Sequence, residues 1–141
     1  RSVGTANFTI RHLKEAMQVA AVPISVNQVE FHPYLYQREL LEFCKKNNIL
    51  LTAYSPLGQG IVIKDKSVKE IAQKLGKMPA QVCLNWALQK GTVVIPRSGS
   101  ELHLKENLDV LGWKLPEEDI RKIDSLSISR RIVNQGFAVF D

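Results

Sequence analysis

The chain has 141 residues, of which 45% are hydrophobic and 23% are charged, and its formal net charge is +5. These values are typical of one globular domain with its own core and argue against a disordered chain. The basic side chains are scattered along predicted helix faces instead of forming one block. This argues against a nucleic-acid module and leaves anionic small molecules as candidate ligands.

The sequence carries no signal for a membrane or for secretion. No apolar run approaches the ~18–20 residues of a membrane span, and the first residues do not form a signal peptide. Cys44 and Cys83 lie within apolar helical patterns, so we expect reduced core thiols and no disulfide. We therefore expect a cytoplasmic protein that does not bind a membrane. The strand-like start directly after Arg1 leads us to expect a part of a longer protein.

Predicted strands and helices alternate from the start of the chain. A strand-like stretch is followed by a helix over about 10–19, which Thr9 is expected to cap. Residues 25–30 have an alternating pattern, which predicts a strand with Asn27 and Gln28 on opposite faces. Each of these amides needs a partner or a ligand, because an unpaired polar group is costly to bury.

The middle of the chain continues this alternation. The pattern predicts a helix over 37–46 and a buried strand over 49–54. Ser67 and Glu70 fit a capping box, so we expect the next helix to start at Ser67. A further helix over about 79–91 has proline in its first turn and glycine at its end.

A short β-branched strand over 93–95 leads through a turn into a helix over about 101–111. The start of such a helix offers free N–H groups and a positive dipole end, and Arg97 adds a guanidinium. Together these groups suit a phosphate. The alternative is that Ser98 or Ser100 only caps the helix, since Ser98 and the glutamate three residues later fit a capping box.

The order of these elements predicts one sheet and one binding edge. Strands separated by helices of ten or more residues indicate a parallel sheet with right-handed crossovers, and a last helix begins near Pro116. Polar residues follow the predicted strands, and the carboxyl ends of parallel strands face the ligand. We expect this edge to gather Asn7, Gln28, Tyr54, Ser55, Arg97 and Ser98.

Several motifs resemble those of the aldo-keto reductase family. They are VGTANF at 3–8, VNQVEFHP at 26–33, LTAYSPLGQG at 51–60, KMPAQVCLNWALQKG at 77–91, VIPRSGSELHLKEN at 94–107 and IVNQGFAVFD at 132–141. The resemblance implies an α/β fold, the C-terminal half of a (β/α)8 TIM barrel, with an extra C-terminal helix and tail. It makes residues 1–141 a partial domain without its N-terminal half, since a full barrel has about 250 residues.

The resemblance implies an NADP(H)-dependent oxidoreductase that reduces aldehydes and ketones to alcohols, represented here by its cofactor-binding half. In the family, the catalytic Tyr, Lys, Asp and His come from the first half of the barrel. Tyr34, Tyr36 and Tyr54 do not match that motif, and we interpret His32 as a loop histidine bonded to backbone. We therefore expect the isolated chain to be inactive.

Partners and a second function class follow from the same resemblance. The complete protein is expected to take a small-molecule carbonyl substrate. The exposed side of this half is expected to meet the missing N-terminal half or a second copy of the chain. The alternative is a non-catalytic NADP(H)-binding barrel with a regulatory or structural role, and the catalytic residues of the missing half would decide between the two.

The resemblance also implies which residues contact the nicotinamide half of the cofactor. Asn7 and Gln28 would hold the carboxamide, and Tyr54 would stack on the ring. Ala6 stands where the family usually has Ser, which removes one hydrogen bond to the carboxamide. The residues expected along the pyrophosphate are Ser55, Leu57 and Gln59.

At the adenosine end, the resemblance implies that Arg97 and Ser98 contact the 2′-phosphate. Glu106 and Asn107 would reach the adenine. His103 stands where the family usually has Arg, and a neutral imidazole is a weaker partner for a phosphate. We therefore expect NADP(H) as the cofactor with a softened preference, which leaves NAD(H) open.

Overall fold

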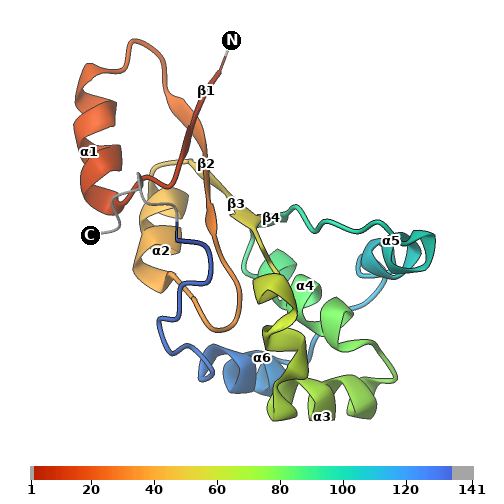
Figure 1. Cartoon of the computed structure of the whole chain (residues 1–141). Coiled ribbons are helices and arrows are strands. Elements are labelled where there is room, and N and C mark those ends of the chain that lie inside the picture. The colour runs from red at the N-terminus through yellow and green to blue at the C-terminus, as the bar shows by residue number, and fades with distance from the viewer. Residues whose placement is uncertain (1, 135–141) are drawn as a thin grey trace.

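Four parallel strands, in the order β1-β2-β3-β4, form the sheet of this computed structural model, which describes residues 2–134. Helices connect the strands along one face, and two α-helices lie between the third and fourth strands, as the sequence predicts (Figure 1). The strands are β1 (Val3–Ala6), β2 (Ile24–Glu30), β3 (Leu50–Tyr54) and β4 (Val93–Val94). The helices are α1 (Ile10–Val19), α2 (Arg38–Lys46), η1 (Gly58–Gly60), η2 (Val62–Lys64), α3 (Lys66–Leu75), α4 (Pro79–Gln89), α5 (Glu101–Leu108) and α6 (Glu117–Asp124).

The register of the sheet decides which side chains share a face. Gln28 of β2 lies between Ala6 of β1 and Thr52 of β3, and Glu30 lies beside Tyr54. Side chains alternate between the two faces of a strand, so these residues share the face opposite to the helices. Pairing continues past β4, since the N–H of residue 95 donates to the Ala53 carbonyl at 3.2 Å.

Helix α1 begins as the sequence predicts, but α3 does not. The Thr9 hydroxyl accepts a hydrogen bond from the His12 N–H at 3.4 Å and caps α1. The predicted capping box of Ser67 and Glu70 is wrong. Asp65 is the N-cap of α3, because its Oδ1 accepts from the Ser67 N–H at 2.8 Å and the next N–H at 3.3 Å. A carboxylate also suits the positive end of the helix dipole.

Helix α5 begins at Glu101, as the sequence predicts, but ends earlier than the pattern suggests. Ser100 is its N-cap and accepts from the His103 N–H at 3.4 Å, so the predicted pairing of Ser98 with Glu101 is wrong. Ser98 instead accepts from the Ser100 N–H at 3.0 Å and shapes the turn before the helix. The helix ends at Leu108 and not near residue 111.

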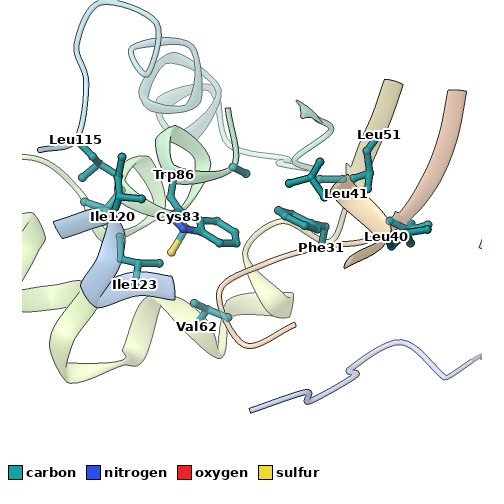
Figure 2. Close-up of a cluster of buried hydrophobic side chains, with 14 of the residues drawn as sticks. Phe31, Leu40, Leu41, Leu51, Val62, Cys83, Trp86, Leu115, Ile120 and Ile123 are labelled. Atoms are coloured by element: carbon teal, nitrogen blue, oxygen red, sulfur yellow. The ribbon is translucent and has the colours of Figure 1, made fainter. Parts of the chain in front are cut away.

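Aromatic side chains in the core join the loop after β2 to α4. The rings of Phe31 and Trp86 stack with centroids 5.3 Å apart, and Tyr36 meets both rings edge-on. Figure 2 shows Phe31 and Trp86 between Leu41 on one side and Ile123 of α6 on the other. The Trp86 Nε1–H donates to Asp124 at 2.8 Å, which fastens α4 to α6. Burial of these large apolar groups is the main stabilising contribution of this layer.

The face of the sheet opposite to the helices is open. Leu50, Val93 and Ile95 expose 40–45% of their surface there. Helix α5 lies apart from the sheet, at the end of the extended segment after β4 (Figure 1), and none of its residues is buried. The apolar side chains of Leu102 and Leu108 on this helix are also exposed. No helix within residues 2–134 is both long and apolar enough to cross a membrane.

Candidate functional site

The carboxyl ends of the first three strands bring three predicted site residues together. The Asn7 N–H donates to the Gln28 carbonyl at 2.8 Å, and the Tyr54 hydroxyl donates to Asn7 Oδ1 at 3.0 Å. Asn7 has a φ of +57°, a conformation that asparagine adopts more readily than most residues. This turn directs the Asn7 amide back over the strand ends, toward Tyr54.

The side-chain amides of Asn27 and Gln28, adjacent in β2, differ in how many hydrogen bonds they form. Asn27 is buried on the helix side, where its Nδ2 donates to the Phe8 carbonyl at 2.9 Å and its Oδ1 accepts from Thr5 at 3.0 Å. Gln28 is half-buried on the opposite face, and within residues 2–134 its side-chain amide has no hydrogen-bond partner. Asn27 is therefore a structural residue, whereas Gln28 keeps a donor and an acceptor for a ligand.

The loop after β3 winds tightly at the same edge. Ser55, Gly58 and Gln59 have positive φ values of 47°, 55° and 52°. A Cβ on Gly58 would lie 2.6 Å from Val62 Cγ2, so only glycine fits there. Ser55 and Leu57 are half-buried, and Gln59 is exposed. The predicted pyrophosphate contacts are thus adjacent in space to Tyr54, at the end of its own strand.

The predicted adenosine contacts lie on the segment after β4 and on α5. Arg97 and His103 are exposed, whereas Ser98 is half-buried. Glu106 and Asn107 are half-buried at the other end of α5, where Gln81 Nε2 donates to the Glu106 carbonyl at 3.0 Å. Among the described residues, no hydrogen bond or ion pair links these five to Asn7, Gln28, Tyr54, Ser55, Leu57 or Gln59.

Sequence reasoning missed Glu30, which holds the segment after α6 against the strand ends. Glu30 is fully buried, and its Oε1 accepts from the Ile132 N–H at 2.8 Å. Its Oε2 accepts from the Val133 N–H at 3.0 Å and lies 3.7 Å from Arg131 Nη1. An acidic residue at the end of an otherwise buried strand, two positions before a histidine, was the available signal.

The interpretation of His32 as a loop histidine bonded to backbone is wrong. His32 is fully buried, and its Nε2 lies 2.8 Å from Glu30 Oε1. An ionised carboxylate only accepts hydrogen bonds, so Nε2 carries the proton in this contact. Its position within the core also makes His32 unsuitable as a proton donor to a ligand.

The pKa values at the strand ends follow from this burial. Burial raises the pKa of Glu30, but the hydrogen bonds from His32, Ile132 and Val133 outweigh it and hold the pKa below its ordinary value. The carboxylate therefore stabilises the fold at neutral pH, and this contribution is lost as the pH falls through the lowered pKa. Burial, with the nearby Glu30 charge, raises the pKa of the Tyr54 hydroxyl, which stays protonated at neutral pH.

A cavity of about 930 Å³ lies beside this site, between the starts of α1 and α2. Asn7 and Arg131 line it, together with residues of 8–11 and 35–40. Gln28 and Tyr54 are not among its lining residues, because they lie on the other face of the sheet. The cavity therefore adjoins the candidate site at Asn7 but does not include Gln28 or Tyr54.

Comparison with known proteins assigns this arrangement to a family. The sequence profile of the Aldo/keto reductase family matches residues 1–128. The chain belongs to the aldo/keto reductase family. Its parallel sheet and connecting helices are part of the barrel of an aldo-keto reductase, as the solved structures below show. The predicted fold class is thereby confirmed.

Relatives and solved structures of aldo-keto reductases match nearly all of the chain. Glyoxal reductase of Bacillus subtilis is 44% identical over 132 residues, which is 94% of this chain and 48% of the reductase. MGS-M4, an aldo-keto reductase enzyme from a Medee basin deep-sea metagenome library, superposes with a TM-score of 0.91 at 35% identity, over 98% of this chain and 52% of that one. AKR2E5 of the silkworm, Bombyx mori, complexed with NADPH, has a TM-score of 0.87 at 28% identity over 93% and 43%.

Each of these matches covers a much larger share of this chain than of the protein it is compared with. The chain spans about half the length of the curated relatives it matches, while nearly all of the chain itself is covered. The residues that this half of an aldo-keto reductase contributes are those at the carboxyl ends of four neighbouring strands.

Proposed function

We propose that this chain is the cofactor-binding half of an NADP(H)-dependent aldo-keto reductase that reduces aldehydes or ketones to alcohols. The observation that carries the proposal is the unsatisfied amide of Gln28, next to Asn7 and Tyr54 at three adjacent strand ends. Family membership and the NADPH complex of a similar structure support it.

The groups at these strand ends fit a nicotinamide carboxamide. Gln28 offers a donor and an acceptor, and Asn7 keeps its Nδ2 as a donor, because Oδ1 already accepts from Tyr54. That hydrogen bond holds the Tyr54 ring on the strand next to that of Gln28 and on the same face of the sheet, where it would stack on a planar ring. A bound cofactor would supply the hydride, and these three residues would orient its ring.

The groups after β3 and β4 fit the charged parts of the same cofactor. Ser55, Leu57 and Gln59 lie at the end of β3, in reach of the next section of a molecule held at Tyr54. Exposed Arg97 and the first turn of α5 offer a guanidinium and free N–H groups for a 2′-phosphate. His103, with Glu106 and Asn107, would lie toward the adenosine.

Within residues 2–134, Tyr34, Tyr36 and His32 are not placed to donate a proton to a carbonyl oxygen. The Tyr34 hydroxyl donates to Asp65 at 2.8 Å, and burial together with this bond raises its pKa. Tyr36 packs in the core against Trp86, and His32 is buried. We therefore expect the isolated chain not to reduce aldehydes, which an NADPH-oxidation assay with an aromatic aldehyde would check.

Substitution of Arg97 in the complete protein tests the proposal. Arg97→Ala should weaken NADPH binding by roughly ten- to hundredfold, because a hydrogen bond between charged groups contributes about 1.5–3 kcal/mol. NADH lacks the 2′-phosphate, so its dissociation constant should change little. Both constants can be measured by fluorescence titration of the purified protein.

The matched control is Lys105→Ala, which removes one positive charge from the exposed side of α5, the helix that follows Arg97. Lys105 pairs with Glu101 at 2.8 Å and is mostly exposed, so its loss should affect both cofactors slightly. Equal losses for NADPH and NADH in Arg97→Ala would show that Arg97 does not bind the 2′-phosphate. Equal effects of the two substitutions on NADPH would show that only the net charge matters.

A further inference from the structure

The buried carboxylate of Glu30 is the point where the segment after α6 meets the strand ends. It receives three hydrogen bonds, from the Ile132 N–H, the Val133 N–H and His32 Nε2, at 2.8–3.0 Å. Two of these donors belong to backbone more than a hundred positions along the chain. A buried carboxylate needs such partners, and the backbone of this segment needs acceptors, so each stabilises the other.

The anchored segment brings Arg131 to the proposed nicotinamide end of the site. Arg131 Nη1 lies 3.7 Å from Glu30 Oε2, and the Arg131 charge lies close enough to Tyr54 to oppose the rise in the pKa of its hydroxyl. Tyr54 in turn donates to Asn7 at 3.0 Å. Arg131 therefore lies between the Glu30 carboxylate and the Tyr54 hydroxyl.

We propose that Glu30 is a positioning residue, which fixes the segment Arg131–Val133 across the strand ends and through Arg131 holds Tyr54 for the nicotinamide ring. This inference rests on the proposed function for its last step only. The anchoring of the segment concerns the chain alone. The two parts can therefore fail separately.

Further contacts between this segment and the rest of the chain show that its position is fixed. The Arg130 N–H donates to the Tyr34 carbonyl at 3.0 Å, and Ser127 Oγ accepts from the Tyr36 N–H at 3.3 Å. A Cβ on Gly58 would lie 3.0 Å from Ile132 Cδ1, so the loop after β3 also packs against the segment. The segment thus touches both the β2–α2 loop and the loop after β3.

Glu30→Gln in the complete protein is the informative substitution, because it keeps the shape of the side chain. An amide replaces one accepting oxygen with a donating NH2 group. All three partners are donors, so in either orientation the NH2 group faces an N–H without an acceptor. Protection against hydrogen exchange should fall by roughly ten- to hundredfold at the Ile132 or the Val133 amide, whichever faces the NH2 group, as expected for loss of a hydrogen bond to a charged group.

Cofactor binding separates the two parts of the inference. NADPH should bind about tenfold more weakly to Glu30→Gln, whereas 2′,5′-ADP, which has no nicotinamide, should bind as it does to the unmodified protein. Arg131→Ala should weaken NADPH to a similar extent while leaving the Ile132 and Val133 amides protected, since their acceptor is intact. It also supplies the test of the Tyr54 step if Glu30→Gln does not fold.

Glu42→Gln on the exposed side of α2 is the matched control and should change neither measurement. Unchanged protection of Ile132 and Val133 in Glu30→Gln would overturn the anchoring. Equal weakening of NADPH and 2′,5′-ADP, or an Arg131→Ala protein with normal NADPH affinity, would overturn the step through Tyr54. An unmodified protein that binds neither nucleotide would contradict the proposed function and that step, while the exchange result would still decide the anchoring.

Discussion

At the scale of single residues, burial decides the chemistry of the two cysteines. Cys44 lies under β2 and Cys83 lies within α4, and neither exposes any surface. Burial raises the pKa of Cys44 to about 11 and that of Cys83 to about 12. The thiolate is the reactive form, so both side chains are inert packing residues at neutral pH.

This burial predicts the labelling behaviour of the thiols in the complete protein. Neither Cys44 nor Cys83 should react with iodoacetamide at pH 7.5 in the native state, and both should react after unfolding in guanidinium. Mass spectrometry of tryptic peptides measures the two positions separately. Native labelling of Cys83 at a rate near that of a free thiol would show that the α4 core opens readily.

At the scale of elements, the start of α3 shows which of two candidate residues, Asp65 or Ser67, caps the helix. Asp65 accepts two N–H hydrogen bonds from the first turn and also accepts from the Tyr34 hydroxyl. Ser67, the cap that the sequence pattern suggests, lies within the helix. The acidic cap therefore fastens α3 to the loop after β2.

Asp65→Ala should lower the free energy of unfolding by about 0.5–2 kcal/mol, the usual cost of losing an N-cap. Ser67→Ala should cost no more than a few tenths of a kcal/mol, since alanine is the better helix former. Urea unfolding of the complete protein, followed by circular dichroism, gives both values. A larger cost for Ser67→Ala than for Asp65→Ala would restore the capping box of the sequence prediction.

The sequence predicts most elements because their signals are local. The periodicity of 10–19 and 37–46 and the alternation of 25–30 are properties of neighbouring residues, and the structure confirms them. Helix starts are harder, because Asp65 and Ser67 are two positions apart and both residue types cap helices well. Only the direction of their side chains in the folded chain decides between them.

Some residues of the candidate site could be predicted from the sequence, and others could not. Asn7 follows β1, while Gln28 and Tyr54 lie near the carboxyl ends of β2 and β3, so parallel topology alone predicts that they meet. Glu30 could not be found by that reasoning, because Ile132 and Val133 are distant in sequence and donate through backbone N–H groups, which leave no trace in residue type. His32 was misinterpreted because the pattern does not show that its ring turns into the core toward the Glu30 carboxylate, two positions earlier.

At the scale of the whole molecule, the open face of the sheet is the dominant feature. Leu50, Val93 and Ile95 are exposed on it, and β1 and β4 are edge strands whose outer backbone groups have no neighbouring strand within residues 2–134. Four strands cannot close a barrel, because closure needs a consistent strand number, tilt and shear. Further strands or another chain would have to cover this face.

We predict that the 141-residue chain on its own does not persist as a well-packed monomer. It should associate through its open face, and pairing of two copies is the commonest closed arrangement. Size-exclusion chromatography with light scattering measures the mass directly. A cooperatively unfolding monomer near 15.9 kDa would contradict this prediction and would mean that the half-barrel has a sufficient core.

A crystal structure of the complete protein with NADPH tests the central claim most directly. The account predicts that the nicotinamide stacks on Tyr54, with its carboxamide hydrogen-bonded to Gln28 and Asn7, and that the 2′-phosphate lies against Arg97 and Ser98. Density for NADPH at another edge of the sheet, with the Gln28 amide still unpaired, would contradict the assignment of this chain as the cofactor-binding half.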